Sequence, residues 1–198
     1  MEYLNRSLFL LLNAGQNAPS ALIALARAVA QYLIWIVPAG LIAAWLRGSN
    51  RTRQALLAAA IAGLVGLLVS QAIGLAWYHP RPFAVGIGRT LLAHAADSSF
   101  PSDHVTLIWA VAISLMARQA TRRAGWALAA LGLPLAWARI YLGLHWPLDM
   151  LGAAFVALPS AWLIRRQERR LIAPAMPLLL SAYRRLCSGP IRSGWVRQ

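Results

Sequence analysis

Residues 54–77 read QALLAAAIAGLVGLLVSQAIGLAW, a run that contains no charged side chain. A helix of about 20 apolar residues crosses the ~30 Å hydrocarbon core of a bilayer, so this run predicts a transmembrane helix. The composition of the whole chain agrees, because 60% of its 198 residues are hydrophobic and only 12% are charged. A soluble domain is about 25% charged, and a disordered chain is far less apolar. Both classes are therefore excluded, and we expect an integral membrane protein.

Four more apolar segments lie along the chain, at residues 21–45, 104–117, 125–142 and 148–164. The segment 104–117 is short for a span, which is acceptable if it begins in a polar pocket sunk into the membrane. Residues 3–13 indicate an interfacial amphipathic helix, since the apolar run Leu8–Leu12 is too short for a signal peptide. The predicted fold class is all-α, a polytopic membrane helix bundle of about five transmembrane helices plus an N-terminal interfacial helix.

Arginine supplies all 19 basic residues, and the net charge is +14. The arginines gather after the first, third and fifth spans: Arg47, Arg51 and Arg53; Arg118, Arg122 and Arg123; Arg165, Arg166, Arg169 and Arg170. These regions lie on one side of the membrane, which the positive-inside rule identifies as the cytoplasm. The N-terminus and the loops 78–103 and 139–147 then face outward. Since this charge sets topology and favours contact with acidic lipid, we expect no nucleic acid partner.

The end of the fifth span divides the chain into two predicted parts. Residues 1–170 form the membrane domain, and residues 171–198 form a basic cytoplasmic tail. Residues 171–183 are apolar, but Pro174 and Pro177 interrupt them, which favours a surface or re-entrant segment over a sixth span. Cys187 is the only cysteine, so an intrachain disulfide and a multi-cysteine metal site are both excluded.

The candidate chemistry lies in and beside the two outward loops. All four histidines and three of the five acidic residues fall there: His79, His94, Asp97, Asp103, His104, His145 and Asp149. Polar groups gathered on one face of an apolar protein indicate a functional site. Ordinary polar loops are the alternative, but they do not explain why the third and fifth spans both begin with His/Asp pairs.

The stretch Phe100-Pro101-Ser102-Asp103-His104 leads directly into the third span. Ser or Asp before an apolar run indicates a helix N-cap, and the free N–H groups of a helix N-terminus bind anions. Capping alone is the simpler interpretation, yet a cap does not need His104. At the next junction, Asp149 follows His145 by four residues. A carboxylate there accepts the proton of one imidazole nitrogen and leaves the other free to attack.

Two arginines complete the pattern. Arg139 ends the fourth span six residues before His145, and Arg81 lies between Pro80 and Pro82, which hold it in a rigid, extended segment. An arginine at a membrane surface is commonly an interface anchor. Two guanidinium groups that reach one pocket, however, clamp the oxygens of a phosphate bidentately. The combination favours a phosphate site.

These segments resemble the signature of the type 2 phosphatidic acid phosphatase family, which reads Lys-x6-Arg-Pro, Pro-Ser-Gly-His and Ser-Arg-x5-His-x3-Asp. The matching stretches here are Arg81-Pro82, Pro101-Ser102-Asp103-His104 and Arg139-x5-His145-x3-Asp149. The spacing of the third motif matches fully, and the similarity extends from about residue 4 to residue 165.

Three positions depart from that signature. Gly74 stands where the family has lysine, Asp103 replaces the motif glycine, and Ala138 replaces the motif serine. The aspartate form of the second motif is similar to the bacitracin-resistance type of undecaprenyl-diphosphatase, and so is Pro80-Arg81-Pro82-Phe83. The missing lysine removes one phosphate ligand of the family.

The resemblance implies a phosphatase that works through a phosphohistidine intermediate, with no metal and no cofactor. His145 would be the nucleophile, Asp149 would orient it, and His104 would be the general acid that later activates water. The implied phosphate ligands are Arg81, Arg139 and Ser102. The remaining candidate pocket residues are Asp103, hypothesised to favour protonated His104, and His79, His94 and Asp97, for which ordinary loop hydrogen bonding is the alternative.

The resemblance also implies a substrate, undecaprenyl diphosphate, hydrolysed to undecaprenyl phosphate and phosphate in cell-wall carrier-lipid recycling and bacitracin resistance. The active site would face the periplasm or cell exterior from the bacterial inner membrane.

Alternatives within the family are a phosphatidylglycerophosphate or phosphatidate phosphatase, and a phosphotransferase that uses undecaprenyl diphosphate as donor. A non-catalytic transporter or accessory subunit is a further alternative, but it would place polar residues within several spans. Only Arg27, Gln31 and Gln71 do so here, and the oligomeric state stays open.

Overall fold

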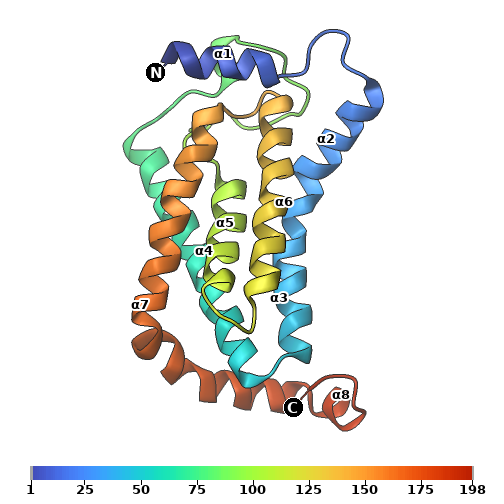
Figure 1. Cartoon of the computed structure of the whole chain (residues 1–198), viewed down its shortest axis with the longest axis vertical. Helices are drawn as coiled ribbons and strands as arrows, with labels where there is room; N and C mark the ends of the chain where they lie inside the picture. The colour runs from blue at the N-terminus through green and yellow to red at the C-terminus, as the bar shows by residue number, and fades with distance from the viewer. Residues whose placement is uncertain (1, 198) are drawn as a thin grey trace.

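The computed structural model describes residues 2–197, and these form helices joined by loops. The elements in chain order are α1 (Glu2–Leu12), α2 (Ser20–Tyr32), η1 (Leu33–Trp35), α3 (Ile36–Arg47), α4 (Asn50–Ala76), η2 (Pro82–Val85), α5 (Asp103–Met116), α6 (Arg122–Tyr141), α7 (Pro147–Leu186) and α8 (Ser188–Arg192). Figure 1 shows an upright bundle with α1 lying across one end and the C-terminal part of α7 crossing the other. The predicted all-α fold class is confirmed.

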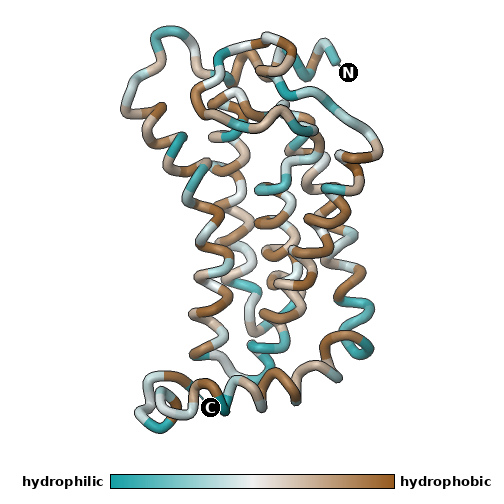
Figure 2. Tube along the Cα trace, turned by 180° about the vertical axis from the view of Figure 1, so that it is seen from behind, coloured by the Kyte–Doolittle hydropathy of each residue, from teal (hydrophilic) through white to brown (hydrophobic). Residues whose placement is uncertain are grey.

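Three helical segments are long and apolar enough to cross a membrane, namely Ser20–Arg47, Asn50–Ala76 and Pro147–Leu186. The shorter apolar helix α5 and the helix α6 run beside them in the bundle (Figure 1). Hydrophobic positions run along the helices, and most hydrophilic positions gather toward the two ends (Figure 2). This is the pattern of a protein whose middle lies in hydrocarbon and whose ends meet water.

Helix α5 is the centre of the bundle, because it packs against α4, α6 and α7. Its buried face includes Val105, Ile108 and Val111. Gly63 on α4 lets the two helices approach closely, since a Cβ atom there would meet the Leu107 side chain at 2.8 Å. Small residues at such crossings are the usual means of helix packing in membranes.

The first predicted span is one continuous segment made of two helices. The α-helical pattern of α2 tightens into the 3₁₀ turn η1 at Leu33–Trp35 and resumes as α3. In the upper half, α2 packs on α6, while α3 packs on α4 in the lower half. The segment therefore changes its partner along its length, and Figure 1 shows it slanting across the outside of the bundle.

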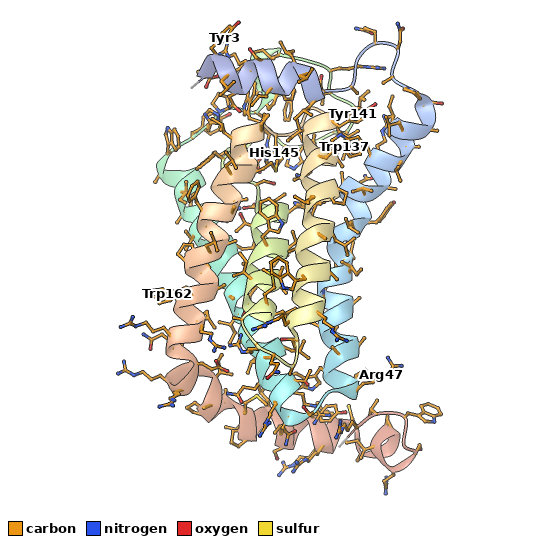
Figure 3. The ribbon with its side chains drawn as sticks, viewed as in Figure 1. Tyr3, Arg47, Trp137, Tyr141, His145 and Trp162 are labelled. Atoms are coloured by element: carbon orange, nitrogen blue, oxygen red, sulfur yellow. The ribbon has the colours of Figure 1, made fainter. Side chains whose placement is uncertain are left out.

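Helix α7 continues well past the predicted fifth span. It runs without a break from Pro147 to Leu186 and contains Pro159, Pro174 and Pro177. Trp162 lies on its upright part, and the remainder turns across the lower end of the bundle (Figures 1 and 3). Proline removes a backbone donor and bends a helix without necessarily ending it. Residues 171–186, the first part of the expected tail, thus continue the same helix.

At the lower end of the bundle, fully buried Arg53 connects α4 to α3, α7 and the C-terminal segment. Its guanidinium lies 4.3 Å from the centre of the Tyr183 ring and donates to the backbone oxygens of Trp45 (3.0 Å) and Arg197 (2.6 Å). Arg53 is therefore a packing residue rather than a surface arginine. Figure 3 shows exposed Arg47 at this end and His145 at the opposite one.

Candidate active site

The turn between α6 and α7 brings the third predicted motif together. Gly143 has a φ of +81°, a left-handed conformation that glycine adopts without steric cost. A Cβ atom at this position would also collide with the backbone oxygen of Arg89. The turn therefore needs glycine, and it places Arg139, in the last turn of α6, beside His145, just before α7.

The Nδ1 atom of His145 faces three oxygen atoms. It lies 2.9 Å from the backbone oxygen of Ser99, 3.2 Å from Oδ2 of Asp149 and 3.4 Å from Oγ of Ser99. A carbonyl oxygen only accepts hydrogen bonds, so Nδ1 carries the proton and Nε2 carries the lone pair. The geometry thus gives His145 the tautomer that a nucleophile needs.

The carboxylate of Asp149 is completely buried. Its Oδ2 atom accepts hydrogen bonds from the Ser99 hydroxyl and from the backbone N–H of Trp146 (2.8 Å). These two donors hold the carboxylate against the imidazole, as predicted from the four-residue spacing. Ser99 was not predicted, because a serine in an irregular loop carries no periodic signal.

Both predicted arginines converge on Nε2 of His145. Nη1 of Arg81 lies 3.0 Å from Nε2, and Nη2 of Arg139 lies 3.3 Å from it. Each guanidinium is almost fully buried, with 4% and 3% of the residue exposed. Two fixed cations next to a neutral nucleophilic nitrogen form a suitable receptor for phosphoryl oxygens.

Arg81 is held by the loop in which it lies. The backbone at this residue is extended, as its flanking prolines predict. Its Nε donates to Asp97 at 2.8 Å, and its Nη1 donates to the backbone oxygen of Leu144 at 2.9 Å. These hydrogen bonds hold the guanidinium of Arg81 toward His145. The exposed carboxylate of Asp97 thus helps to position Arg81.

His94 is the second neighbour of Arg139. Its Nδ1 lies 3.1 Å from the backbone oxygen of Ala95, and its Nε2 lies 3.1 Å from Nη2 of Arg139. His94 therefore accepts a hydrogen bond from Arg139 in its neutral form. The structure brings this candidate into the site, and also places its ring 6.4 Å from that of His145.

His79, by contrast, contributes through its backbone. Its N–H donates to Oγ of Ser98, and its carbonyl oxygen accepts from the N–H of Ser99 at 2.7 Å. The ring packs near Trp77 and Trp146 instead, with centres 5.8 and 6.5 Å away. His79 thus secures the loop that carries Ser99.

The start of α5 lies near His94, Arg81 and Arg139. Ser102 is the N-cap residue, but its side chain makes no capping bond, and its buried Oγ has no hydrogen-bond partner within residues 2–197. His104 follows in the first turn, where the positive charges of Arg139 and Arg81 act on it. A free hydroxyl and the N–H groups of a helix N-terminus are suited to binding phosphoryl oxygens.

Asp103 turns away from this cluster toward α4. Its Oδ1 accepts from the Ser70 hydroxyl and its Oδ2 from the Gln71 amide, both at 2.5 Å. Two side chains of α4 therefore hydrogen-bond the carboxylate oxygens of Asp103. These contacts give Asp103 a role in joining α4 to α5, which is an alternative to the hypothesised effect on His104.

Helix α1 lies across the end of the bundle that carries His145 (Figure 3). The buried side chain of Asn5 accepts from the backbone N–H of Leu148 at 3.1 Å, and Phe9 packs on Trp146 with ring centres 5.1 Å apart. Asn13 donates to the backbone oxygens of Arg89 (2.9 Å) and Tyr141 (3.0 Å). The interfacial helix predicted at 3–13 thus also holds the loops of the site in place.

Burial dominates the electrostatics of His145. Loss of solvent, together with the positive charges of Arg139 and Arg81, holds the pKa of His145 well below its ordinary value. Partial burial also lowers the pKa of His94. Both rings are therefore neutral at pH 7, and His145 presents an unprotonated Nε2 to an incoming electrophile.

Comparison with known proteins places this arrangement among membrane phosphatases. The sequence matches the PAP2 superfamily over residues 51–173. It is 40% identical to YbjG of Escherichia coli (strain K12), named provisionally as an undecaprenyl-diphosphatase, over all of this chain and 99% of that protein. It is 37% identical to undecaprenyl-diphosphatase BcrC of Bacillus subtilis (strain 168), over 78% of this chain and 79% of that protein.

Two more distant matches complete the comparison. A Bacillus licheniformis protein named bacitracin transport permease protein BcrC is 28% identical over 67% of this chain and 65% of its own length. The crystal structure of Aquifex aeolicus LpxE superposes with a TM-score of 0.69 at 20% identity, covering 82% of this chain and 95% of that one. The latter similarity establishes a common fold.

Proposed function

This chain belongs to the PAP2 superfamily, and from that premise we propose that it hydrolyses undecaprenyl diphosphate to undecaprenyl phosphate and inorganic phosphate. One observation carries the chemistry: the unprotonated Nε2 of buried His145 lies between the guanidinium groups of Arg81 and Arg139. The undecaprenyl-diphosphatase names of two relatives that match most of the chain support the choice of lipid.

The first step forms a bond between Nε2 of His145 and the terminal phosphorus. The bond from that phosphorus to the bridging oxygen breaks, and His104 donates its proton to the departing lipid phosphate. Arg81 and Arg139 bind the equatorial oxygens, on which negative charge is concentrated during transfer. Ser102 and the N–H groups at the start of α5 provide further donors.

Asp149 acts as His145 becomes positively charged. Its carboxylate lies 3.2 Å from Nδ1, where it stabilises the charge that develops on the ring during attack. In the second step, His104 removes a proton from water, the water oxygen attacks phosphorus, and the bond to Nε2 breaks. Inorganic phosphate leaves, and both histidines return to their starting protonation states.

Hydrolysis is favoured over transport by the location of the polar groups. They cluster at the end of the bundle that carries His145, whereas a solute pathway requires polar residues along the spans. The arginine-rich opposite end supports a cytoplasmic location for the C-terminus and an outward-facing site. Undecaprenyl diphosphate released on the outer face would then reach the site with its headgroup at the membrane surface.

The test is phosphate release by detergent-purified protein in the presence of EDTA. Undecaprenyl diphosphate, phosphatidylglycerophosphate and phosphatidate are supplied separately at equal concentration. We expect undecaprenyl diphosphate to give a kcat/KM at least tenfold higher than either phosphoglycerolipid, without loss of rate in EDTA. Preference for a phosphoglycerolipid would replace the proposed substrate, and loss of activity in EDTA would contradict the metal-independent mechanism.

A further inference from the structure

We propose that the end of the bundle opposite His145 binds one anionic phospholipid, with one of its acyl chains in a cavity between α3, α4, α5 and α6. The phosphate of this lipid would be bound by Arg122 and Arg123 at the start of α6. The site lies at the other end of the molecule from the proposed catalytic groups (Figures 1 and 3), and it does not depend on the proposed function.

The cavity has the size and lining of a site for a hydrocarbon chain. Its volume is about 850 Å³, within the range of sites that hold small organic ligands. Most of its walls are aliphatic, contributed by four helices: Ile36, Val37, Leu41 and Ala44 of α3, Leu56 of α4, Val111 and Leu115 of α5, and Ala127, Leu128 and Leu131 of α6.

The cavity exists because the first span changes its packing partner along its length. Helix α2 packs on α6, whereas α3 packs on α4, so the lower part of α6 is left open on this side. The cavity face of α3 recurs at Ile36, Val37, Gly40, Leu41 and Ala44, the spacing of one helical face. Because both bordering helices lie within the bundle that crosses the membrane, the natural occupant is a lipid chain.

The polar residues of the cavity are concentrated near the α5–α6 loop. Arg122 and Arg123 line it together with Gln119 and Thr121. Within residues 2–197 neither guanidinium forms a hydrogen bond or an ion pair, and both arginines are exposed. Two free guanidinium groups at the rim of an apolar cavity complement a negatively charged headgroup.

The backbone at the start of α6 adds to this complementarity. Thr121 is the N-cap residue, but its hydroxyl donates to the backbone oxygen of Leu115 and forms no cap. The helix therefore begins with uncapped N–H groups and the positive end of its dipole, both of which favour an anion. A zwitterionic headgroup would bring a second, positive group to the same arginines.

A neighbouring hollow strengthens the positive potential. It shares Gln119 and Ala120 with the cavity and is lined by Arg51, Arg118 and Arg165, with Glu168 as the one acidic residue. Glu168 accepts a hydrogen bond from Arg118 at 2.9 Å and from Gln54 at 3.2 Å. Three guanidinium groups against one carboxylate leave a net positive charge next to the headgroup position.

The test measures thermal unfolding of the purified protein in neutral detergent during titration with phosphatidylglycerol or phosphatidylcholine. Because a ligand that binds the folded state stabilises it by mass action, we expect phosphatidylglycerol to raise the Tm by about 5–10 °C at saturation. Phosphatidylcholine should give less than a third of that shift. Equal shifts from both lipids would overturn the proposed recognition of the anionic headgroup.

Two variants locate the lipid. The double substitution Arg122→Gln and Arg123→Gln should abolish the preference for phosphatidylglycerol. Gly40→Phe should abolish the shift by filling the cavity, since a Cβ atom at Gly40 meets nothing within 4 Å. Ala39→Phe is the matched control, because Ala39 is exposed on the same helix but does not line the cavity.

A third variant separates this site from the catalytic one. His145→Ala should retain the full phosphatidylglycerol shift, because His145 lies at the opposite end of the bundle (Figure 3). Loss of the shift in His145→Ala would place the lipid in the catalytic site and overturn the proposal. A shift that survives both Gly40→Phe and the double arginine substitution would overturn it equally. If Gly40→Phe fails to fold, the arginine variant alone decides the result.

Discussion

The hydroxyl of Ser99 donates a hydrogen bond to Oδ2 of Asp149, the same oxygen that lies 3.2 Å from Nδ1 of His145. The backbone oxygen of Ser99 also lies 2.9 Å from that nitrogen. One residue of the loop before α5 therefore orients both members of the His/Asp pair. Its position determines which imidazole nitrogen is free to attack.

Ser99→Ala should lower kcat while the protein still folds. The lost hydrogen bond is to a charged group, which is worth about 1.5–3 kcal/mol, so kcat should fall about 10- to 100-fold. Ser99→Thr retains the hydroxyl and should restore most of the rate, which separates a positioning role from simple packing. Steady-state kinetics on both variants is the measurement, and an unchanged kcat in Ser99→Ala would contradict the role.

Arg139→Lys should be strongly impaired although it keeps the charge. Nη2 of Arg139 contacts both His94 and His145, which directs the guanidinium toward the proposed phosphate position, and a lysine ammonium lacks the planar fork that binds a phosphate bidentately. We expect kcat/KM to fall about 100-fold. Arg47→Lys, at the opposite end of the bundle (Figure 3), is the control and should change kcat/KM less than twofold. Near-normal activity of Arg139→Lys would show that charge alone is sufficient.

The pH dependence should reflect the lowered pKa of His145. Burial, with the charges of Arg139 and Arg81, holds this pKa well below 6.5, so the ring stays neutral as the pH falls through 6.5. The acidic limb of kcat/KM attributable to His145 should therefore lie below pH 6.5.

Arg81→Gln provides the comparison for this limb. It removes a positive charge next to the ring, so protonation becomes easier and the limb should move to higher pH. Ionisation of the substrate is the same for both proteins and does not affect the difference. Coincident acidic limbs in the pH profiles of wild type and Arg81→Gln would contradict this account.

Asp103→Asn tests how the unusual aspartate contributes. Its two oxygens accept from Ser70 and Gln71 of α4, so we expect a loss of about 1 kcal/mol in folding stability and a pH–rate profile like that of wild type. Thermal unfolding and kinetics measured together distinguish the roles. A displaced pH–rate profile at unchanged stability would instead support the hypothesis that Asp103 tunes His104.

Hydropathy predicted the bundle well because burial in hydrocarbon demands long apolar helices. The predicted spans 54–77 and 104–117 differ by only a few residues from α4 and α5. The continuation of α7 beyond residue 164 was not predicted. A cluster of arginines ends a membrane span, but it does not end a helix, because arginine has a high helix propensity. The change of partner at η1 depends on tertiary packing and has no sequence signal.

Motif spacing predicted which chemical groups meet, but not how they are supported. Arg81, Arg139, His145 and Asp149 converge as expected because each is next to a helix end. Ser99 depends on how the loop folds back onto α7, where a Cβ atom at Gly152 would collide with the ring of Phe100. The contact between Ser70 and Asp103 joins residues far apart in the chain, and no local sequence pattern predicts it.

The most direct test of the central claim is to trap the covalent intermediate. Protein in EDTA is mixed with undecaprenyl diphosphate that carries a radiolabelled terminal phosphate, quenched in alkali within milliseconds, and digested for peptide mapping. We expect label on His145 in the wild type and neither label nor phosphate release in His145→Ala. Phosphate release without any labelled protein, or turnover by His145→Ala, would contradict the phosphohistidine mechanism.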